Sequence, residues 1–99
     1  MSQSFSAVLM NENDNVATVL ADLEVESFVT ASYGDKELGV KLLQSIPFGH
    51  KFAVASIKKG EKIYKYGEII GVASCDIAIG EHVHVHNLEG TRGRGDING

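Results

Sequence analysis

The chain has few of the residues that staple or anchor small proteins. Cys75 is its single cysteine, which excludes an internal disulfide and a zinc site built from several cysteines. No apolar run approaches the roughly 20 residues that a membrane-spanning helix needs, and the first residues lack the basic-then-apolar layout of a secretory signal. We therefore expect a cytoplasmic protein with no membrane partner, held together by packing.

Basic residues are also scarce. The chain has 9 Lys and Arg against 13 Asp and Glu, a net charge of −4. Residues 1–50 hold seven acids and two lysines, whereas residues 51–99 hold six acids and seven Lys and Arg. Binding to phosphate backbones needs an excess of basic side chains on one face, so nucleic acid is not an expected partner. The second half of the chain still allows a small anionic ligand at a local cluster.

Recognisable catalytic motifs are missing as well. The sequence contains no Gly-x-Ser-x-Gly elbow, no phosphate-cradling glycine loop and no pair of carboxylates at a recognisable spacing. We therefore expect no catalysis by this chain alone, and its polar groups to form half of a site.

What remains is the composition of one folded domain. The chain has 99 residues, of which 43% are apolar and 22% charged, as in an ordinary globular domain. We expect a disordered N-terminus over residues 1–6, a folded domain over 7–89 and a flexible tail over 90–99, rich in Gly and Arg. Arg92 and Arg94 in that tail are suited to binding carboxylates.

The pattern of apolar residues predicts a mainly β fold. Short β-branched and aromatic runs are separated by turn residues at 5–10, 24–32, 38–43, 52–55 and 69–73. One short helix is expected near residues 15–23, where Asp14 is a suitable N-cap and four apolar residues have helical spacing: Val16, Val19, Leu20 and Leu23.

An internal repeat supports a compact barrel-like arrangement. Residues 56–63 align with residues 76–83, and in both copies an isoleucine is followed by two residues, Gly-Glu and the start of a strand. Gly60 and Gly80 are expected to have positive φ at equivalent turns. Two such units would pack around one core as a small barrel or clip.

Three histidines alternate near the end of the domain. In a strand, His82, His84 and His86 share one face with their rings about 7 Å apart, and neighbouring rings of such a row can share one metal ion. We take His84 and His86 as the metal pair, because the amide of Asn87 follows and can orient a ligand or close a turn. A simple solvated face, hydrogen bonding to a substrate hydroxyl and general acid–base work stay open as alternatives.

A second set of residues is suited to a carboxylate. His50 and Lys51 follow Gly49 and form a small cationic site, although a surface turn with incidental charges explains them equally well. Lys65 and Tyr66 in the first repeat copy stand where Val85 and His86 stand in the second. The predicted substrate-binding residues are His50, Lys51, Lys65, Tyr66 and Asn87.

Three segments in this order, 46–53, 65–71 and 80–89, carry a family resemblance. They resemble the N-terminal domain, or separate small subunit, of the altronate/galactarate dehydratase (altronate hydrolase) family, from about Ala7 to Asp96. The resemblance implies a SAF-type domain with a β-clip fold. It also implies hexonate or hexarate dehydration with a divalent metal such as Fe²⁺ or Mn²⁺, on a larger catalytic portion that follows the domain or forms a separate chain.

The leading hypothesis is a small subunit or N-terminal domain of a sugar-acid hydro-lyase that adds histidines to a site completed by a large catalytic subunit. One alternative is the small subunit of sulfolactate sulfo-lyase. Others are a SAF module that binds carbohydrate or protein without catalysis, and an assembly clamp. A second copy of the chain is a further candidate partner.

Overall fold

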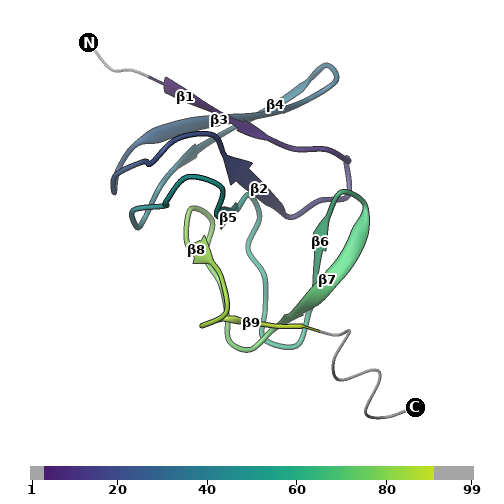
Figure 1. Cartoon of the computed structure of the whole chain (residues 1–99). Helices are drawn as coiled ribbons and strands as arrows, with labels where there is room; N and C mark the ends of the chain where they lie inside the picture. Colours follow the sequence, from purple (N-terminus) through teal and green to yellow (C-terminus); the bar gives the residue numbers. More distant parts are fainter. Residues whose placement is uncertain (1–3, 91–99) are drawn as a thin grey trace.

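The computed structural model describes residues 4–90, and these form strands joined by turns (Figure 1). The mainly β prediction is confirmed. No helix within the described range is long and apolar enough to cross a membrane. The strands are β1 (Ser4–Val8), β2 (Val16–Val19), β3 (Phe28–Tyr33), β4 (Lys36–Lys41), β5 (Lys51–Ala53), β6 (Lys62–Lys65), β7 (Glu68–Ala73), β8 (His82–Val83) and β9 (Leu88–Glu89).

The strands form two sheets. The larger has the order β4-β3-β1-β2-β5-β8, and the smaller has the order β6-β7-β9. β1 and β3 pair in parallel, whereas the other pairs are antiparallel. Figure 1 shows the β6–β7 hairpin standing beside the segment that joins β1 to β2.

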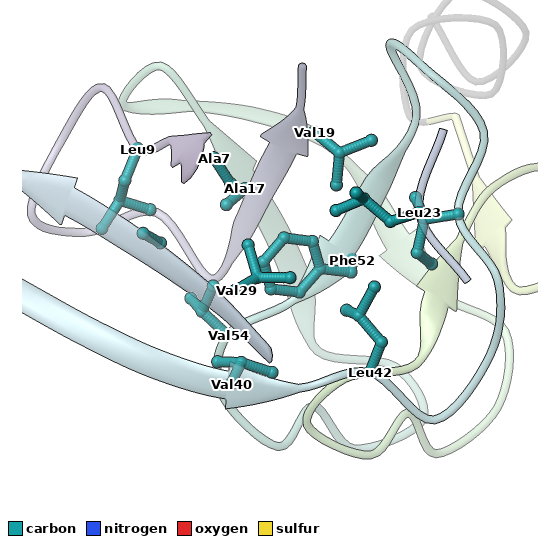
Figure 2. Packing of buried hydrophobic residues seen from close by; sticks show 12 residues of the cluster. Ala7, Leu9, Ala17, Val19, Leu23, Val29, Val40, Leu42, Phe52 and Val54 are labelled. Carbon is teal, nitrogen blue, oxygen red and sulfur yellow. The ribbon is translucent and has the colours of Figure 1, made fainter. Parts of the chain in front are cut away.

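Two apolar clusters hold the sheets together, and β2 and β5 contribute to both. Ala17 and Phe52 belong to the first cluster, while their chain neighbours Val16 and Ala53 belong to the second. Successive side chains of a strand point to opposite faces, so a strand between two cores is apolar without alternation. Figure 2 shows the ring of Phe52 among the aliphatic side chains of the first cluster.

The helix expected near residues 15–23 is wrong, because Val16–Val19 is strand β2. Val16 and Ala17 are both 1% exposed, which a strand buried on two faces explains and a one-sided helix does not. Leu20, counted among the helical stripe, is 55% exposed. Over so short an apolar run, the spacing cannot separate a helix from a buried strand.

The chain ends also differ from expectation. Residues 4–6 were assigned to a disordered N-terminus, yet they belong to β1 and pair with β3. Residues 1–3 and the tail residues 91–99, with Arg92 and Arg94, lie outside the described residues.

Within residues 4–90 the turn of the repeat occurs at four places, two more than the sequence alignment shows. Each copy begins with a buried aliphatic residue, and these pair across two bridges, Leu23 with Ile46 and Ile57 with Ile77. Three residues later each turn has a positive φ, of 72° at Glu26, 83° at Gly49, 88° at Gly60 and 90° at Gly80. The positive φ predicted for Gly60 and Gly80 is thus confirmed.

An aspartate ties each pair of turns together. Asp22 Oδ1 accepts a hydrogen bond from Phe48 N at 2.7 Å, and Asp76 Oδ1 accepts one from Lys59 N at 2.8 Å. The second pair therefore repeats the construction of the first.

Candidate functional site: a cluster of histidines

Three imidazole rings converge where β5 meets β8. His50 Nδ1 lies 2.9 Å from His82 Nε2. The ring of His84 lies 4.4 Å from that of His50 and 5.5 Å from that of His82, between centroids, and all three pairs are stacked. One candidate ligand atom from each residue lies within 4.8 Å of the others. We call His50, His82 and His84 the histidine cluster.

Strand pairing brings these residues together. β5 and β8 are antiparallel, with Lys51 opposite Val83 and Phe52 opposite His82. Phe52 and Val83 are both fully buried, so they anchor the two strands to the core. His50 and His82 are 32 residues apart in the sequence, and the pairing of their strands sets their distance.

The histidine row is not a continuous strand, which corrects the sequence expectation. β8 ends at Val83, and residues 84–87 form a turn in which Asn87 N donates to His84 O at 3.0 Å. The turn leaves His86 exposed, with its ring centroid 5.4 Å from that of His82. His50 and His82, rather than His86, therefore complete the cluster with His84.

Asn87 builds this turn from inside. Its side chain is 1% exposed, its Oδ1 accepts from His84 N at 2.9 Å, and its Nδ2 donates to His82 O at 2.9 Å. Of the two roles considered for this amide, the structure shows the turn-closing one. The substrate-binding assignment of Asn87 is a poor fit to a buried amide with both ends bonded, so we treat Asn87 as a positioning residue.

Gln44 is a second positioning residue, and the sequence offered no signal for it. Its Oε1 accepts from His82 N at 2.9 Å. His82 is therefore held from both sides, by Gln44 at its N–H and by Asn87 at its carbonyl.

The cluster is electrostatically unfavourable to added protons. Partial burial lowers the pKa of His82, and positive charge on His50, His86, His84 and Lys51 lowers it further. The pKa of His84 is lowered by desolvation and by His50, Lys51 and His86. A ring that accepts in the contact between His50 and His82 must be neutral at that nitrogen. The lowered pKa values of His82 and His84 favour the neutral rings, which can bind a metal or accept a proton.

Lys51 connects the cluster to the predicted residues of the β6–β7 hairpin. Burial and the charge of Lys65 lower the pKa of the Lys51 ammonium. Lys65 Nζ lies 4.8 Å from the centroid of the Tyr66 ring, which is part of a side chain 54% exposed. A bound anion would reduce the repulsion between these two ammonium groups.

The donor set of the cluster fits a transition metal. Two nitrogens bound to one ion at about 2.0–2.1 Å lie roughly 3.0–3.4 Å apart, so the 2.9 Å contact is close to ligand spacing and His84 needs only a small adjustment. Imidazole nitrogen suits iron, copper, nickel and zinc better than the purely oxygen-bound ions. The three histidines could therefore hold one such ion, with further positions left for other ligands.

Comparison with known proteins decides the family. Residues 5–91 match the altronate/galactarate dehydratase SAF domain. The chain belongs to this family. It is 43% identical to altronate dehydratase of Bacillus subtilis over 84 residues, and 49% identical to altronate dehydratase of Escherichia coli over 74 residues.

The lengths of the relatives differ greatly. The matched segments cover 85% and 75% of this chain but only 16% and 14% of the two altronate dehydratases. By contrast, (2R)-sulfolactate sulfo-lyase subunit alpha of Chromohalobacter salexigens is 33% identical over 92 residues, which cover 90% of this chain and 98% of that protein. The SAF domain thus occurs both within a long chain and as nearly the whole of a short subunit.

Proposed function

We propose that this chain is the SAF component of a sugar-acid hydro-lyase and contributes its histidine cluster to an active site completed by a larger catalytic polypeptide. The observation that carries the proposal is the convergence of His50, His82 and His84 within 4.8 Å in a domain of this family. The proposed substrate is a hexonate or hexarate such as altronate or galactarate.

The lengths of the relatives support an active site that this domain shares with a further polypeptide or domain. In the two altronate dehydratases, about five sixths of the chain lies outside the matched segment, whereas the sulfo-lyase relative is named as one subunit of an enzyme. The three histidines of the cluster are half-buried, and two grooves among the described residues lie elsewhere, one beside Leu23 and Ile46 and one beside Gly60 and Tyr64. A catalytic partner would supply the missing walls.

Dehydration of a sugar acid needs several catalytic and binding groups, and this chain offers only some of them. A hydro-lyase removes a proton beside a carboxylate and expels a hydroxyl group, so it needs a base, an acid for the leaving oxygen and a binding group for the carboxylate. A divalent metal, when bound, would polarise the departing oxygen. Lys51 and Lys65 are suited to the carboxylate, while the base is assigned to the partner.

We assign the metal, if the cluster binds one, to Fe²⁺ rather than Mn²⁺. Three imidazoles are a nitrogen donor set, which suits iron, whereas manganese prefers carboxylates and water. We propose His50, His82 and His84 as the ligand set in place of the predicted pair His84 and His86, because these three converge, and we propose that His86 lies outside the set.

Sulfolactate is the second candidate substrate. The sulfo-lyase subunit alpha aligns with this chain over nearly its full length, and sulfolactate, like altronate and galactarate, presents an α-hydroxy carboxylate. The cytoplasmic location, the lack of nucleic-acid binding and association with a second copy stay predictions.

Metal titration tests the proposal in the chain itself. Calorimetry with Fe²⁺ under anaerobic conditions should give one site per chain, lost in His50→Ala, His82→Ala and His84→Ala, with protons released on binding at low pH. His86→Ala is the matched control, because His86 is close to the cluster but outside the convergent set, and it should retain the site. Binding that survives in the triple alanine variant would rule out the cluster as the metal site.

A further inference from the structure

The chain contains a buried carboxylate that the proposed chemistry does not use. Asp14 is 7% exposed and lies between β1 and β2. Its Oδ2 accepts from Tyr66 N at 2.9 Å, and its Oδ1 accepts from Gly67 N at 2.8 Å. Both oxygens are thus directed at the turn of the β6–β7 hairpin, 52 and 53 residues away in the sequence.

That turn holds a tyrosine in a conformation that residues other than glycine rarely adopt. Lys65 and Glu68 are the last paired residues, so Tyr66 and Gly67 form a two-residue turn, with φ of 59° and 76°. Positive φ at both positions is the requirement of a type I′ hairpin turn, where Asn, Asp and Gly are preferred. A bulky residue there costs of order 1–3 kcal/mol.

The β3–β4 hairpin has a glycine at the first position of its two-residue turn. Its turn also has two residues between paired positions, Tyr33 and Lys36, and its first central residue is Gly34, with φ of 58°. Tyr66 stands at the same first position with nearly the same φ, although Gly67 beside it also has positive φ whereas Asp35 does not. A tyrosine at a position that favours Gly, Asn or Asp suggests a use for its side chain.

Asn15 fixes the strand that leads into this turn. Its Oδ1 accepts from Tyr64 N at 2.8 Å, and its Nδ2 donates to Lys62 O at 3.0 Å. Asp14 and Asn15 together attach both β6 and its turn to the start of β2. The backbone from which the Lys65 and Tyr66 side chains project is therefore held in place.

The groups that the turn presents are the Lys65 ammonium and the Tyr66 ring, 4.8 Å apart. A lysine ammonium with a phenol beside it offers several hydrogen-bond donors and a positive charge, which suits a carboxylate. The repulsion between Lys65 and Lys51 would be relieved by an anion at the same place.

We propose that Asp14 is a positioning residue that holds Tyr66 in its left-handed conformation and so presents the Tyr66 hydroxyl and the Lys65 ammonium to a carboxylate of the substrate. This inference rests on the proposed function for the identity of the ligand. The effect of Asp14 on the conformation of the turn can be measured without knowing the ligand.

The test is a titration of the ¹⁵N-labelled 99-residue chain with galactarate, followed by NMR, together with hydrogen exchange of the Tyr66 and Gly67 amides. In the wild type, galactarate should shift the Tyr66 and Gly67 signals saturably, and both amides should be protected. Asp14→Asn keeps one acceptor oxygen, so it should expose one of the two amides and weaken galactarate binding about tenfold, as expected for the loss of one well-placed charge-assisted contact.

Tyr66→Gly is the matched variant if Asp14→Asn does not fold. Glycine accepts positive φ, so the turn should stay protected while binding weakens to a similar degree. Adding Asp14→Asn to Tyr66→Gly should then weaken binding by less than Asp14→Asn does alone, because the ring that Asp14 places is already gone. Sulfate at the same concentration is the ligand control.

Four results would overturn the inference. Two concern the wild type: no response of the turn to galactarate, or an equal response to sulfate. The other two are wild-type affinity in Asp14→Asn with an amide exposed, and wild-type affinity in Tyr66→Gly. These outcomes are separate from the metal titration, so a silent turn with an intact histidine site would leave the proposed function standing.

Discussion

The turns that begin at Ile46 and Ile57 have the same backbone conformation, but the side chain at their fifth residue makes different contacts. In the Ile57 turn, Glu61 Oε1 accepts from Lys58 N at 2.8 Å, and in the Ile77 turn Glu81 Oε1 accepts from Ala78 N at 2.9 Å. Each glutamate thus caps its own turn. The corresponding residue of the Ile46 turn is His50, whose ring contacts His82 instead.

Pro47 explains why the Ile46 turn needs no capping glutamate. Proline stands where Lys58 and Ala78 stand in the other turns, and it has no N–H to be capped. Position 50 is therefore released from the structural task that a glutamate performs elsewhere. The comparison indicates that His50, a proposed metal ligand, stands at a position where the fold does without a capping residue.

The largest expected effect compares two glycines at equivalent turns. A Cβ on Gly80 would lie 2.3 Å from Lys41 O, whereas one on Gly60 would meet nothing within 4 Å, although both have positive φ. We expect Gly80→Ala to destabilise the fold by about 3 kcal/mol or more and Gly60→Ala by about 1 kcal/mol, from backbone strain alone. Urea unfolding measures both, and equal losses would show that the two turns are packed alike.

Removing a capping glutamate should have a moderate effect. Glu61→Ala and Glu81→Ala should each cost about 1 kcal/mol, because Lys58 N and Ala78 N lose their acceptor. His50→Ala should change stability by less than about 0.5 kcal/mol while it removes metal binding. Glu61→Gln keeps an acceptor oxygen and serves as the control. A His50→Ala loss as large as that of Glu61→Ala would contradict the contrast between the two turns.

A double-mutant cycle isolates the role of Pro47. His50→Glu alone should gain no cap, since Pro47 offers no donor, whereas Pro47→Ala with His50→Glu restores both partners. The two changes should therefore couple favourably by about 0.5–1 kcal/mol in unfolding free energy. Additive effects would mean that the Ile46 turn is not equivalent to its relatives.

The smallest expected effect is on pH dependence in metal-free buffer. The pKa values of His82 and His84 are lowered from 6.5, so the unfolded chain binds protons more readily than the folded chain. Stability should be independent of these groups above about pH 6.5 and should fall as the pH drops through the lowered values. The His82→Gln, His84→Gln double variant should have a flatter profile between roughly pH 5 and 7.5. Identical profiles would show that the cluster does not resist protonation.

The sequence predicted those features that depend on local chemistry. The β class, the repeat and the positive φ of Gly60 and Gly80 follow from β-branched runs and turn residues. The helix near residues 15–23 failed because four apolar residues fit either period. The prediction of a strand through His86 was wrong because the Asn87 side chain closes a turn after Val83. The sequence held a signal for that turn, since an Asn three residues after His84 has the spacing for such a bond.

Long-range contacts set the rest of the site. His50 joins the cluster only because β5 pairs with β8, and Asp14 reaches Tyr66 across 52 residues. Gln44 fixes His82 across 38 residues. One sequence without aligned relatives carries no local signal for such pairs, since they depend on register between strands.

Reconstitution with a large catalytic dehydratase subunit tests the central claim most directly. Galactarate or altronate dehydration should appear when that subunit is combined with the wild-type chain and should be lost when the chain carries His50→Ala and His84→Ala, with His86→Ala largely active. Full turnover with the double variant, in a complex shown to be assembled, would contradict the claim that the histidine cluster forms part of the active site.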